Sequence, residues 1–380
     1  MTGCLGKCKT IGFLTAAMAL ASPGASADSS HRIRPGESLS TIARDHGISI
    51  ASLIAHNRIL REDHIQAGTK LSIPDGSQPL PRLPPQWVMA KPPLSAQTTK
   101  SSAERGGNPC RTKDPGFGSY GDWDSSPMLG KMLAPKSGGL DENGEFDVLF
   151  HFHGTEPVRK EWVRGMRRGV LVAVDLGIGS GPYSEAFGEH ARFRNLVASV
   201  EAAMAKRHGV AAARVRHVGL SAWSAGYGAV GTILNQSYGR RRVDSVFLLD
   251  GLHAGYSGVS MNPRQLQPYA DFARRAAAGD SLMFVSHSSI LPNGYASTTE
   301  TAQYLTWATG GQPVSATPRR SDPLGLELIS KFSQNKFHVR GFSGSAKADH
   351  CAHVALLRDV FRVHLMSHWA PPADRRTTSR

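Results

Sequence analysis

The chain has 380 residues, of which 40% are hydrophobic and 19% are charged. This composition is that of a globular protein and excludes a wholly disordered chain, and the length allows more than one domain. The formal net charge of +14 either favours anionic partners or only maintains solubility. Lys and Arg are scattered rather than gathered in a basic stripe with interleaved aromatic residues, so we expect no nucleic-acid partner.

The first 27 residues have the pattern of a cleaved export signal. Lys7 and Lys9 precede a short apolar core at 11–21, and small residues at 25–27 form a cleavage site. The apolar core is too short to span a bilayer as a stable helix. We expect cleavage after residue 27, with an uncleaved anchor as the alternative. The mature chain is then periplasmic, cell-wall-associated or extracellular, with no integral membrane segment.

Residues 28–75 are predicted to form a compact module with the element order β-α-α-β. Strands are expected over 31–34 and 70–73, with turn residues and a helix N-cap after the first of them. Leu39 and Ile42 follow at the spacing of one buried helix face.

The motif Arg-Pro-Gly-Glu-Ser-Leu at 34–39, together with Asn57 and Gln-Ala-Gly at 66–68, resembles a LysM domain. The resemblance implies binding to N-acetylglucosamine-containing glycans, chiefly peptidoglycan or chitin, in a groove between two loops. The same residues can simply build the fold, although backbone groups contribute to glycan binding in this family. The implied glycan-binding residues are Gly36, Glu37, Ser38, Leu39, Ile65, Gln66, Ala67 and Gly68.

A Pro- and Ser-rich linker is expected over 76–105, because its composition cannot bury a core. A second domain is predicted over 106–372, followed by a basic tail over 373–380. Cys110 and Cys351 remain after signal cleavage. In an oxidising compartment they form either one disulfide or two separate thiols.

From residue 146 onward, apolar runs alternate with helical patterns. This alternation predicts a mainly parallel sheet with helices on both faces, whose chemistry gathers at the carboxyl ends of the strands. Strands are expected over 146–152, 169–176, 215–220, 243–249, 282–285 and 337–342, and helices over 189–207, 225–236 and 355–368.

The sharpest motif is Ser-Ala-Trp-Ser-Ala-Gly-Tyr-Gly at 221–228, where a strand runs into a helix. A tight turn there exposes the hydroxyl of Ser224 above the sheet as a nucleophile. Small residues are needed two positions before and after it, and Ala222 and Gly226 meet this demand. The usual motif has Gly at both positions, so Ala222 is a mild departure. Ser221 is the weaker candidate for the nucleophile.

The segment His153-Gly154-Thr155 ends an earlier strand and is similar to the His-Gly loop that supplies an oxyanion donor in lipases and esterases. Backbone N–H groups in such a loop can stabilise a developing oxyanion. We expect the N–H groups of Gly154, Thr155 and Ala225 to form the oxyanion hole.

The base and the acid are expected after the nucleophile. His350 follows the last predicted strand and is the preferred base, with His353 as the alternative on a helix surface or behind the site. Asp250 ends a strand and is the preferred acid, with Glu300 on a following loop as the alternative.

Together these motifs resemble the α/β-hydrolase superfamily over about 146–369. The resemblance implies an α/β-hydrolase fold and a Ser224-His350-Asp250 triad that needs no cofactor and no metal. An exported esterase acting on wall-associated ester substrates is the expected function, with amidase or peptidase activity also open.

Two other functions stay open at this stage. His151, His153, His350 and His353 have ligand-like spacing, which is compatible with a metal-dependent hydrolase. A non-catalytic wall-binding protein with an inert hydrolase-like domain is the second alternative.

Overall fold

The computed structural model describes residues 29–34, 37, 39, 42, 45–46, 53, 56–57, 67–73, 112–257, 260–317 and 324–370. The chain divides into two units, Met1–Pro85 and Gln86–Arg380, and each is treated by itself. The predicted signal segment, the linker over 76–105, Cys110 and the tail over 373–380 lie outside the described residues. No helix in the described part of the chain is long and apolar enough to cross a membrane.

The first unit is built on an antiparallel pair of strands, β1 (Ser29–Arg32) and β2 (Lys70–Ile73). β1 begins and ends two residues before the strand expected over 31–34. Asn57 links the helical part to β2, because its amide donates to the carbonyls of Leu53 and Ser72 and its Oδ1 accepts from the Ser72 N–H. The described core residues are Ile33, Leu39, Ile42, Leu53, Leu71 and Ile73.

The second unit contains one large sheet, in which nine described strands follow the order β11-β12-β13-β10-β7-β6-β4-β5-β3. The strands from β13 to β5 in this order are parallel, and the outer strands β3, β12 and β11 are antiparallel. This confirms the predicted mainly parallel sheet. The strands are β3 (Lys131–Leu133), β4 (Glu145–Phe152), β5 (Val170–Val174), β6 (Arg214–Trp223), β7 (Val243–Leu249), β10 (Leu282–His287), β11 (Val314–Ser315), β12 (Leu328–Gln334) and β13 (Phe337–Phe342), beside the small pair β8 (Tyr256–Ser257) and β9 (Ser260–Met261).

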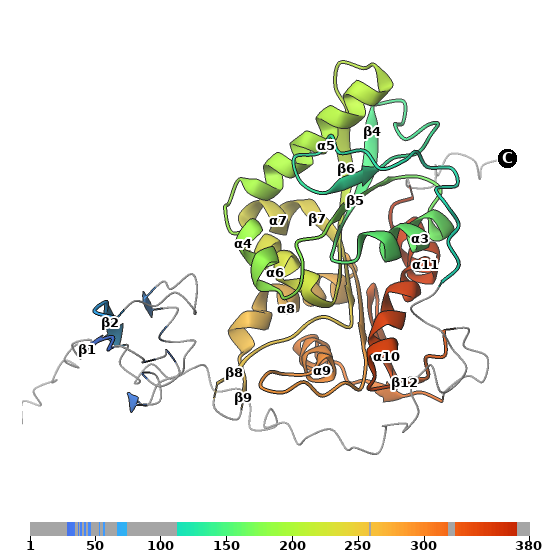
Figure 1. The fold of residues 1–380 in the computed structure, drawn as a ribbon. Coiled ribbons are helices and arrows are strands. Elements are labelled where there is room, and N and C mark those ends of the chain that lie inside the picture. The colour runs from blue at the N-terminus through green and yellow to red at the C-terminus, as the bar shows by residue number, and fades with distance from the viewer. Residues whose placement is uncertain are drawn as a thin grey trace, which may run out of the picture. The chain divides into compact units, whose positions relative to one another are not determined.

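Helices cover both faces of this sheet (Figure 1). One face carries α4 (Gly181–Ala186), α5 (Arg192–His208), α6 (Tyr227–Asn235), α7 (Ser237–Arg242), α8 (Pro263–Ala278) and α9 (Thr298–Ala308). The other face carries α3 (Thr155–Gly165) and the helical run α10 (Lys347–Ala352), η4 (His353–Leu356), α11 (Leu357–Val360), η5 (Phe361–Leu365) and α12 (Met366–His368).

The central strands are buried on both sides, which explains their nearly continuous apolar sequences. Along β4, Val148 and Phe150 pack into the core under α5 and α6, whereas Leu149 packs into the core under α3 and α11. Along β7, Leu248 and Phe247 divide between the two cores in the same way.

The order of the strands creates a switch point between β4 and β6. The chain leaves β4 through α3 toward β5 on one side, and it leaves β6 through α6 toward β7 on the other. The helices α3 and α6 therefore depart from neighbouring strands to opposite faces of the sheet (Figure 1). In open parallel sheets the crevice at such a point, outside the carboxyl ends of the strands, is where ligands bind.

The helical run after β13 begins at Lys347, eight residues before the single helix expected over 355–368. Its first turn is capped by Asp349, whose carboxylate accepts the Ala346 N–H at 3.0 Å. His350 therefore lies within α10 rather than on a loop before the last helix.

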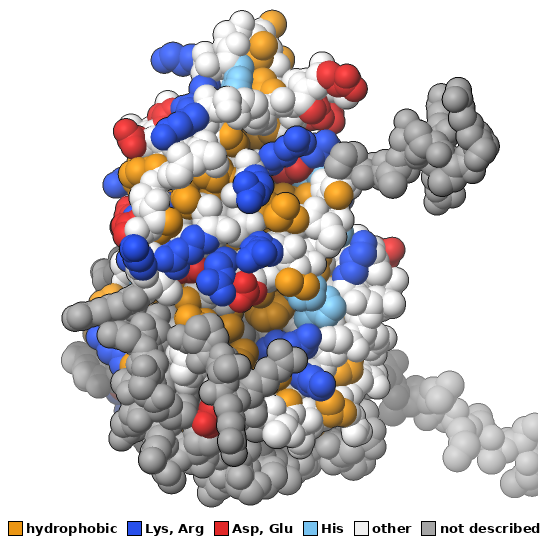
Figure 2. All heavy atoms as spheres, turned by 90° about the vertical axis from the view of Figure 1, so that its right-hand side faces the viewer, with side chains coloured by type: hydrophobic (Ala, Val, Ile, Leu, Met, Phe, Trp, Pro, Cys, Tyr) orange, Lys and Arg blue, Asp and Glu red, His pale blue; other side chains and the backbone are white. Residues whose placement is uncertain are grey.

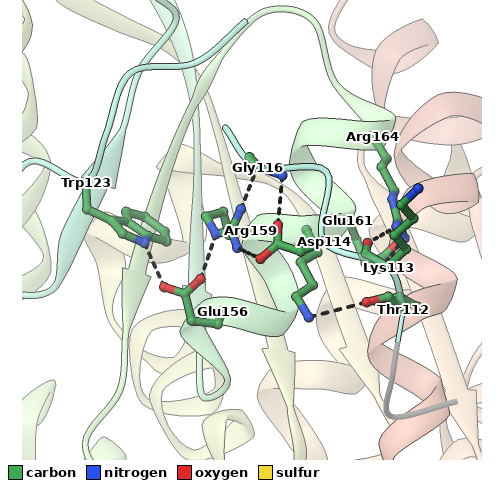
Figure 3. Close-up of polar contacts among 10 residues, drawn as sticks. Thr112, Lys113, Asp114, Gly116, Trp123, Glu156, Arg159, Glu161 and Arg164 are labelled. Carbon is green, nitrogen blue, oxygen red and sulfur yellow. Dashed lines mark hydrogen bonds and ion pairs between the residues drawn. The ribbon is translucent and has the colours of Figure 1, made fainter. Parts of the chain in front are cut away.

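The segment at 112–116 is fixed to α3 by a polar network (Figure 3). Arg159, only 4% exposed, donates to the Asp114 carboxylate at 2.7 Å, to Glu156 at 2.6 Å and to the Gly116 carbonyl at 2.6 Å. Trp123 adds a bond from its indole N–H to Glu156 at 2.9 Å. The network anchors the first described residues of this unit beside the helix that begins at Thr155.

The surface over α3 and α11 carries Lys and Arg side chains in several separate groups with acidic side chains among them (Figure 2). Part of this charge is paired locally, as in the ion pair between Arg358 and Asp359 at 2.9 Å. On this face the positive charge of the chain forms no single continuous stripe.

Candidate active site

Backbone strain gathers at the carboxyl ends of three neighbouring strands. His153 after β4, Ser224 after β6 and Asp250 after β7 have φ values of 72°, 49° and 44°. In the described part of the chain one other non-glycine residue, Asn335, has positive φ. Left-handed conformations are costly for residues with a Cβ, and such strained residues cluster at functional sites.

Close backbone packing around the turn that carries Ser224 explains why small residues are needed beside Ser224. A Cβ at Gly226 would lie 2.1 Å from the Phe152 carbonyl oxygen, so the helix start passes directly against the end of β4. A Cβ at Gly251 would lie 2.3 Å from the Ser224 carbonyl oxygen. The turn after β7 is thus packed against the backbone of Ser224.

His350 and Asp250 meet at this edge of the sheet. The His350 Nδ1 lies 2.8 Å from the Asp250 Oδ2. The Asp250 Oδ1 accepts from the Ser288 N–H at 2.7 Å and from the Thr298 hydroxyl at 2.6 Å. Asp250 is 2% exposed and His350 keeps 24% of its side chain exposed. A carboxylate held by three hydrogen-bond partners thus orients an imidazole that stays partly exposed.

The pKa of Asp250 lies below its ordinary value. Burial alone raises the pKa, but the charge of a protonated His353 and the hydrogen bonds from His350 and Thr298 outweigh it. The buried group is therefore a carboxylate rather than a carboxylic acid.

Trp223 ties His350 to the end of β6. Its indole N–H donates to the His350 carbonyl at 3.1 Å, and the two rings are stacked with centroids 5.1 Å apart. The Trp223 ring is also stacked with the His153 ring, with centroids 5.3 Å apart. Because Trp223 directly precedes Ser224, these contacts place α10 beside the serine turn. The sequence indicates this role of Trp223 only through its position directly before Ser224.

The three amides expected to form an oxyanion hole differ in their present partners. The Gly154 N–H donates to the Asp175 Oδ2 at 3.2 Å, so this amide is already engaged. Thr155 is the first residue of α3, and Ala225 lies in the single turn Ser224–Gly226 that leads into α6. The first N–H groups of a helix have no acceptor within it. Thr155 and Ala225 are therefore the amides that a ligand could use.

Asp175 is a residue of this edge to which the sequence analysis gives no catalytic role. Its carboxylate accepts from the Tyr183 hydroxyl at 3.0 Å and lies 3.5 Å from the His153 Nδ1. Burial raises the pKa of Asp175, but hydrogen bonds from Gly154, Gly177 and Tyr183 outweigh it and lower the pKa.

Glu300, the alternative acid, and His353, the alternative base, do not lie where the sequence predicts them. Glu300 is in the first turn of α9 rather than on a loop, and its carboxylate accepts from the Ser297 N–H and the Tyr256 hydroxyl, both at 2.7 Å. His353 is fully buried rather than on a helix surface, with its Nδ1 2.8 Å from the Ser286 hydroxyl. Burial lowers the pKa of His353 to about 4.

Ser221 and His151 pair with each other inside the protein. The His151 Nε2 donates to the His153 carbonyl at 2.7 Å, so its Nδ1 accepts from the Ser221 hydroxyl at 2.9 Å. Both nitrogens of His151 are occupied, and burial lowers its pKa to about 3. Within the described ranges no three His, Cys, Asp or Glu side chains are grouped as a metal site would need. Among the described residues, His151, His153, His350 and His353 therefore form no such group.

Four of the expected glycan-binding residues of the first unit are described. The Glu37 carboxylate accepts from the Arg34 N–H and bonds His31, both at 2.8 Å, and Leu39 is 4% exposed in the core. Gly68 has φ of 92° and its N–H donates to the Ile33 carbonyl. Ala67 is exposed beside it. Gly36, Ser38, Ile65 and Gln66 lie outside the described residues.

Cys351 follows His350 in α10 and is disulfide-bonded. The pairing with Cys110 remains a prediction, because Cys110 is outside the described residues.

The comparisons with known proteins bear mainly on the first unit. The LysM domain family matches residues 31–74. Residues 31–74 are thus a LysM domain, a module that supports binding to peptidoglycan or chitin-like glycan and typically acts at the cell wall. A search of curated proteins finds no match for this chain.

Three solved structures show weak similarity to the chain. The first is an uncharacterised protein from Capnocytophaga ochracea DSM 7271, with 15% identity, a TM-score of 0.37 and coverage of 64% of each chain. The spore cortex-lytic enzyme SleL of Bacillus megaterium QM B1551 has 11% identity, a TM-score of 0.18 and coverage of 76% of this chain and 68% of the other. SleL of Bacillus cereus has 12% identity, a TM-score of 0.18 and coverage of 86% and 80%.

These TM-scores are too low to establish a shared fold. The chain spans about 64% of the length of the Capnocytophaga ochracea protein.

Proposed function

We propose that the second unit is a serine hydrolase of the α/β-hydrolase type, acting as an esterase on substrates near the glycan that the LysM domain binds. The observation that carries the proposal is the strained Ser224 between strand and helix, whose neighbour Trp223 contacts the His350 that pairs with the buried Asp250. A serine held in this way, with a base oriented by a buried carboxylate, is the arrangement expected of a nucleophile.

In this mechanism Ser224 attacks the acyl carbon while His350 takes its proton through Nε2. Asp250 holds the His350 Nδ1–H and stabilises the imidazolium that forms. The N–H groups of Thr155 and Ala225 bind the oxyanion. His350 then returns the proton to the leaving alcohol, and water releases the acyl group by the reverse sequence. Trp223 favours the imidazolium, because its stacked ring attracts a cation.

The Gly154 amide has a different place in this mechanism from the one expected from the sequence. The Gly154 N–H donates to Asp175, so we assign it the role of stabilising the conformation of the loop at 153–155. Hydrogen bonds from Gly154 and Tyr183 disperse the charge of the Asp175 carboxylate, which limits its repulsion of an oxyanion bound at Thr155.

Labelling with a fluorophosphonate probe tests the proposal, because only an activated serine reacts with it. We expect one adduct on the wild-type chain, mapped by mass spectrometry to Ser224, and none on Ser224→Ala. The exposed Ser126→Ala variant serves as the control and should label like wild type. A folded wild-type chain that does not label would overturn the proposal and favour an inert domain.

Retention on the wall is expected to depend on Asn57. Its three hydrogen bonds join the helical part of the LysM domain to β2, and their loss costs about 1–3 kcal/mol in a domain with a small core. Asn57→Ala should reduce co-sedimentation of the full chain with insoluble peptidoglycan at least about tenfold.

The control for this experiment is Ser30→Ala, which changes an exposed residue of β1. Fluorophosphonate labelling of Ser224 should be the same in all three proteins, because Asn57 and Ser30 belong to the first unit and Ser224 to the second. Full retention of an Asn57→Ala chain whose LysM domain has lost its fold would show that another part of the chain binds the wall.

A further inference from the structure

A cavity of about 400 Å³ lies among α4, α6, α8 and the loop after β7. These three helices lie side by side on one face of the sheet (Figure 1). Tyr227 lines the cavity three residues after Ser224, and His253 lines it three residues after Asp250. His253 is also close enough to Asp250 and His350 for their charges to act on its pKa, so the cavity adjoins the proposed catalytic residues, which are not among its lining residues. Its volume is within the range of sites for small ligands.

The polar groups in the lining are arranged to bind hydroxyls. The His253 Nδ1 donates to the Ala296 carbonyl at 2.9 Å, which leaves its Nε2 as an acceptor. Burial lowers the pKa of His253, so the ring is neutral at pH 7. Gln265 accepts from the Gly255 N–H at 2.7 Å through its Oε1, which leaves its amide hydrogens as donors. The residues that line the cavity thus include one with a remaining acceptor and one with remaining donors.

The cavity also has an apolar wall. Tyr227 and Pro268 line it, and the Tyr227 ring packs edge to face against the His253 ring at 5.9 Å. The C–H face of a sugar ring can pack against such a wall while its hydroxyls reach the polar groups. A lipid acyl chain would instead leave these polar groups without partners at a cost in affinity.

Arg264 gives the cavity a positive charge. It is exposed in the first turn of α8, and in the described part of the chain its guanidinium has no hydrogen-bond or ion-pair partner. The other arginines of α8 are engaged: Arg274 bonds Asp271 at 2.7 Å, and Arg275 bonds the Arg240 carbonyl at 2.9 Å. A free guanidinium in a ligand cavity is suited to bind a carboxylate through two parallel hydrogen bonds.

We propose that this cavity binds a sugar ring that carries a carboxylate, as part of the ester substrate cleaved at Ser224. The sugar hydroxyls bond His253 and Gln265, the ring packs on Tyr227, and the carboxylate pairs with Arg264. This inference rests on the proposed serine hydrolase function and adds the substrate class to it.

The test measures how sugars protect Ser224 of the full chain from fluorophosphonate labelling. N-acetylmuramic acid and N-acetylglucosamine share the same ring, and only the first bears a carboxylate. We expect N-acetylmuramic acid to halve the labelling rate at a concentration about tenfold lower, because a charge-assisted hydrogen bond is worth about a factor of ten in affinity. Labelling reports on the catalytic unit, so glycan bound to the LysM domain does not disturb the comparison.

Arg264→Gln should remove this preference, so that the two sugars protect at similar concentrations. The matched control is Arg274→Gln, which changes an ion-paired arginine of the same helix outside the cavity and should keep the preference. Equal protection by both sugars in wild type, or no protection by either, would overturn the inference even if Arg264→Gln failed to fold. Absence of any labelling in wild type would instead overturn the proposed hydrolase function.

Discussion

Replacing Asp250 with asparagine is expected to lower kcat for ester hydrolysis about 10⁴-fold while the fold is kept. Asparagine has nearly the same shape, and its Oδ1 can still accept from the Ser288 N–H and the Thr298 hydroxyl. Its amide, however, donates toward the His350 Nδ1 and selects the tautomer with hydrogen on Nε2. An Nε2–H cannot take the proton of Ser224, so the nucleophile is not activated.

The same variant has a defined pH signature in stability. The pKa of Asp250 is below its ordinary value of 3.8 in the folded protein. Its carboxylate therefore contributes stability above that value, and the contribution is lost as pH falls toward the folded pKa. The unfolding free energies of wild type and Asp250→Asn should differ most near neutral pH and converge below pH 3.8.

Asp271→Asn is the control for both measurements, because Asp271 forms an exposed ion pair with Arg274 on α8. Its kcat should match wild type. A kcat for Asp250→Asn within tenfold of wild type would show that Asp250 is not the acid of the triad. Glu300→Gln would then be the next variant, although Glu300 is engaged in capping α9.

Replacing Gly251 with alanine is expected to reduce kcat/KM about 100-fold, although residue 251 contacts no substrate in the proposed mechanism. The added Cβ would lie 2.3 Å from the Ser224 carbonyl oxygen and 2.7 Å from its nitrogen. Backbone cannot yield as a flexible side chain does, so the turn carrying Ser224 must move. A displacement of about 1 Å at a reacting group can cost a factor of 100 in rate.

Overpacking at Gly251 should also lower the unfolding free energy by about 1–3 kcal/mol, measured by denaturant titration. Gly181→Ala is the matched control, because a Cβ at Gly181 has no neighbour within 4 Å and its φ is not positive. It should change neither quantity appreciably. Wild-type activity in Gly251→Ala would show that the position of the Ser224 backbone is not critical for catalysis.

The sequence predicts the central part of the second unit well, because strands buried on both faces appear as short apolar runs. The runs at 243–249 and 337–342 have the same limits as β7 and β13. Strand β12, second from the edge of the sheet, has a weak pattern of partly exposed residues and is not predicted. Helix α3 is also missed, since its buried Arg159 and Glu161 interrupt the apolar stripe.

The sequence predicts the candidate site only in part, because it marks the ends of strands but not the contacts between distant residues. Strand ends mark Ser224 and Asp250, but no sequence pattern shows that Asp175 reaches the Gly154 amide. A buried histidine such as His353 looks the same in sequence as an exposed one. The position of Glu300 had a readable signal, because Ser297 and Glu300 have the spacing of a capping box.

Three residues at the strand ends have a left-handed backbone conformation, which lowers the stability of the fold but keeps side chains that the proposed function uses. In the described part of the chain most positive-φ positions are glycine, the residue that adopts this conformation without steric cost. His153, Ser224 and Asp250 keep side chains there, and each side chain carries a group able to exchange a proton or attack a carbon. Glycine at any of the three would relieve about 1–2 kcal/mol of strain and remove that group. Ser224 and Asp250 are needed in the proposed mechanism, so the strain at this edge of the sheet is a stability cost of the proposed catalysis.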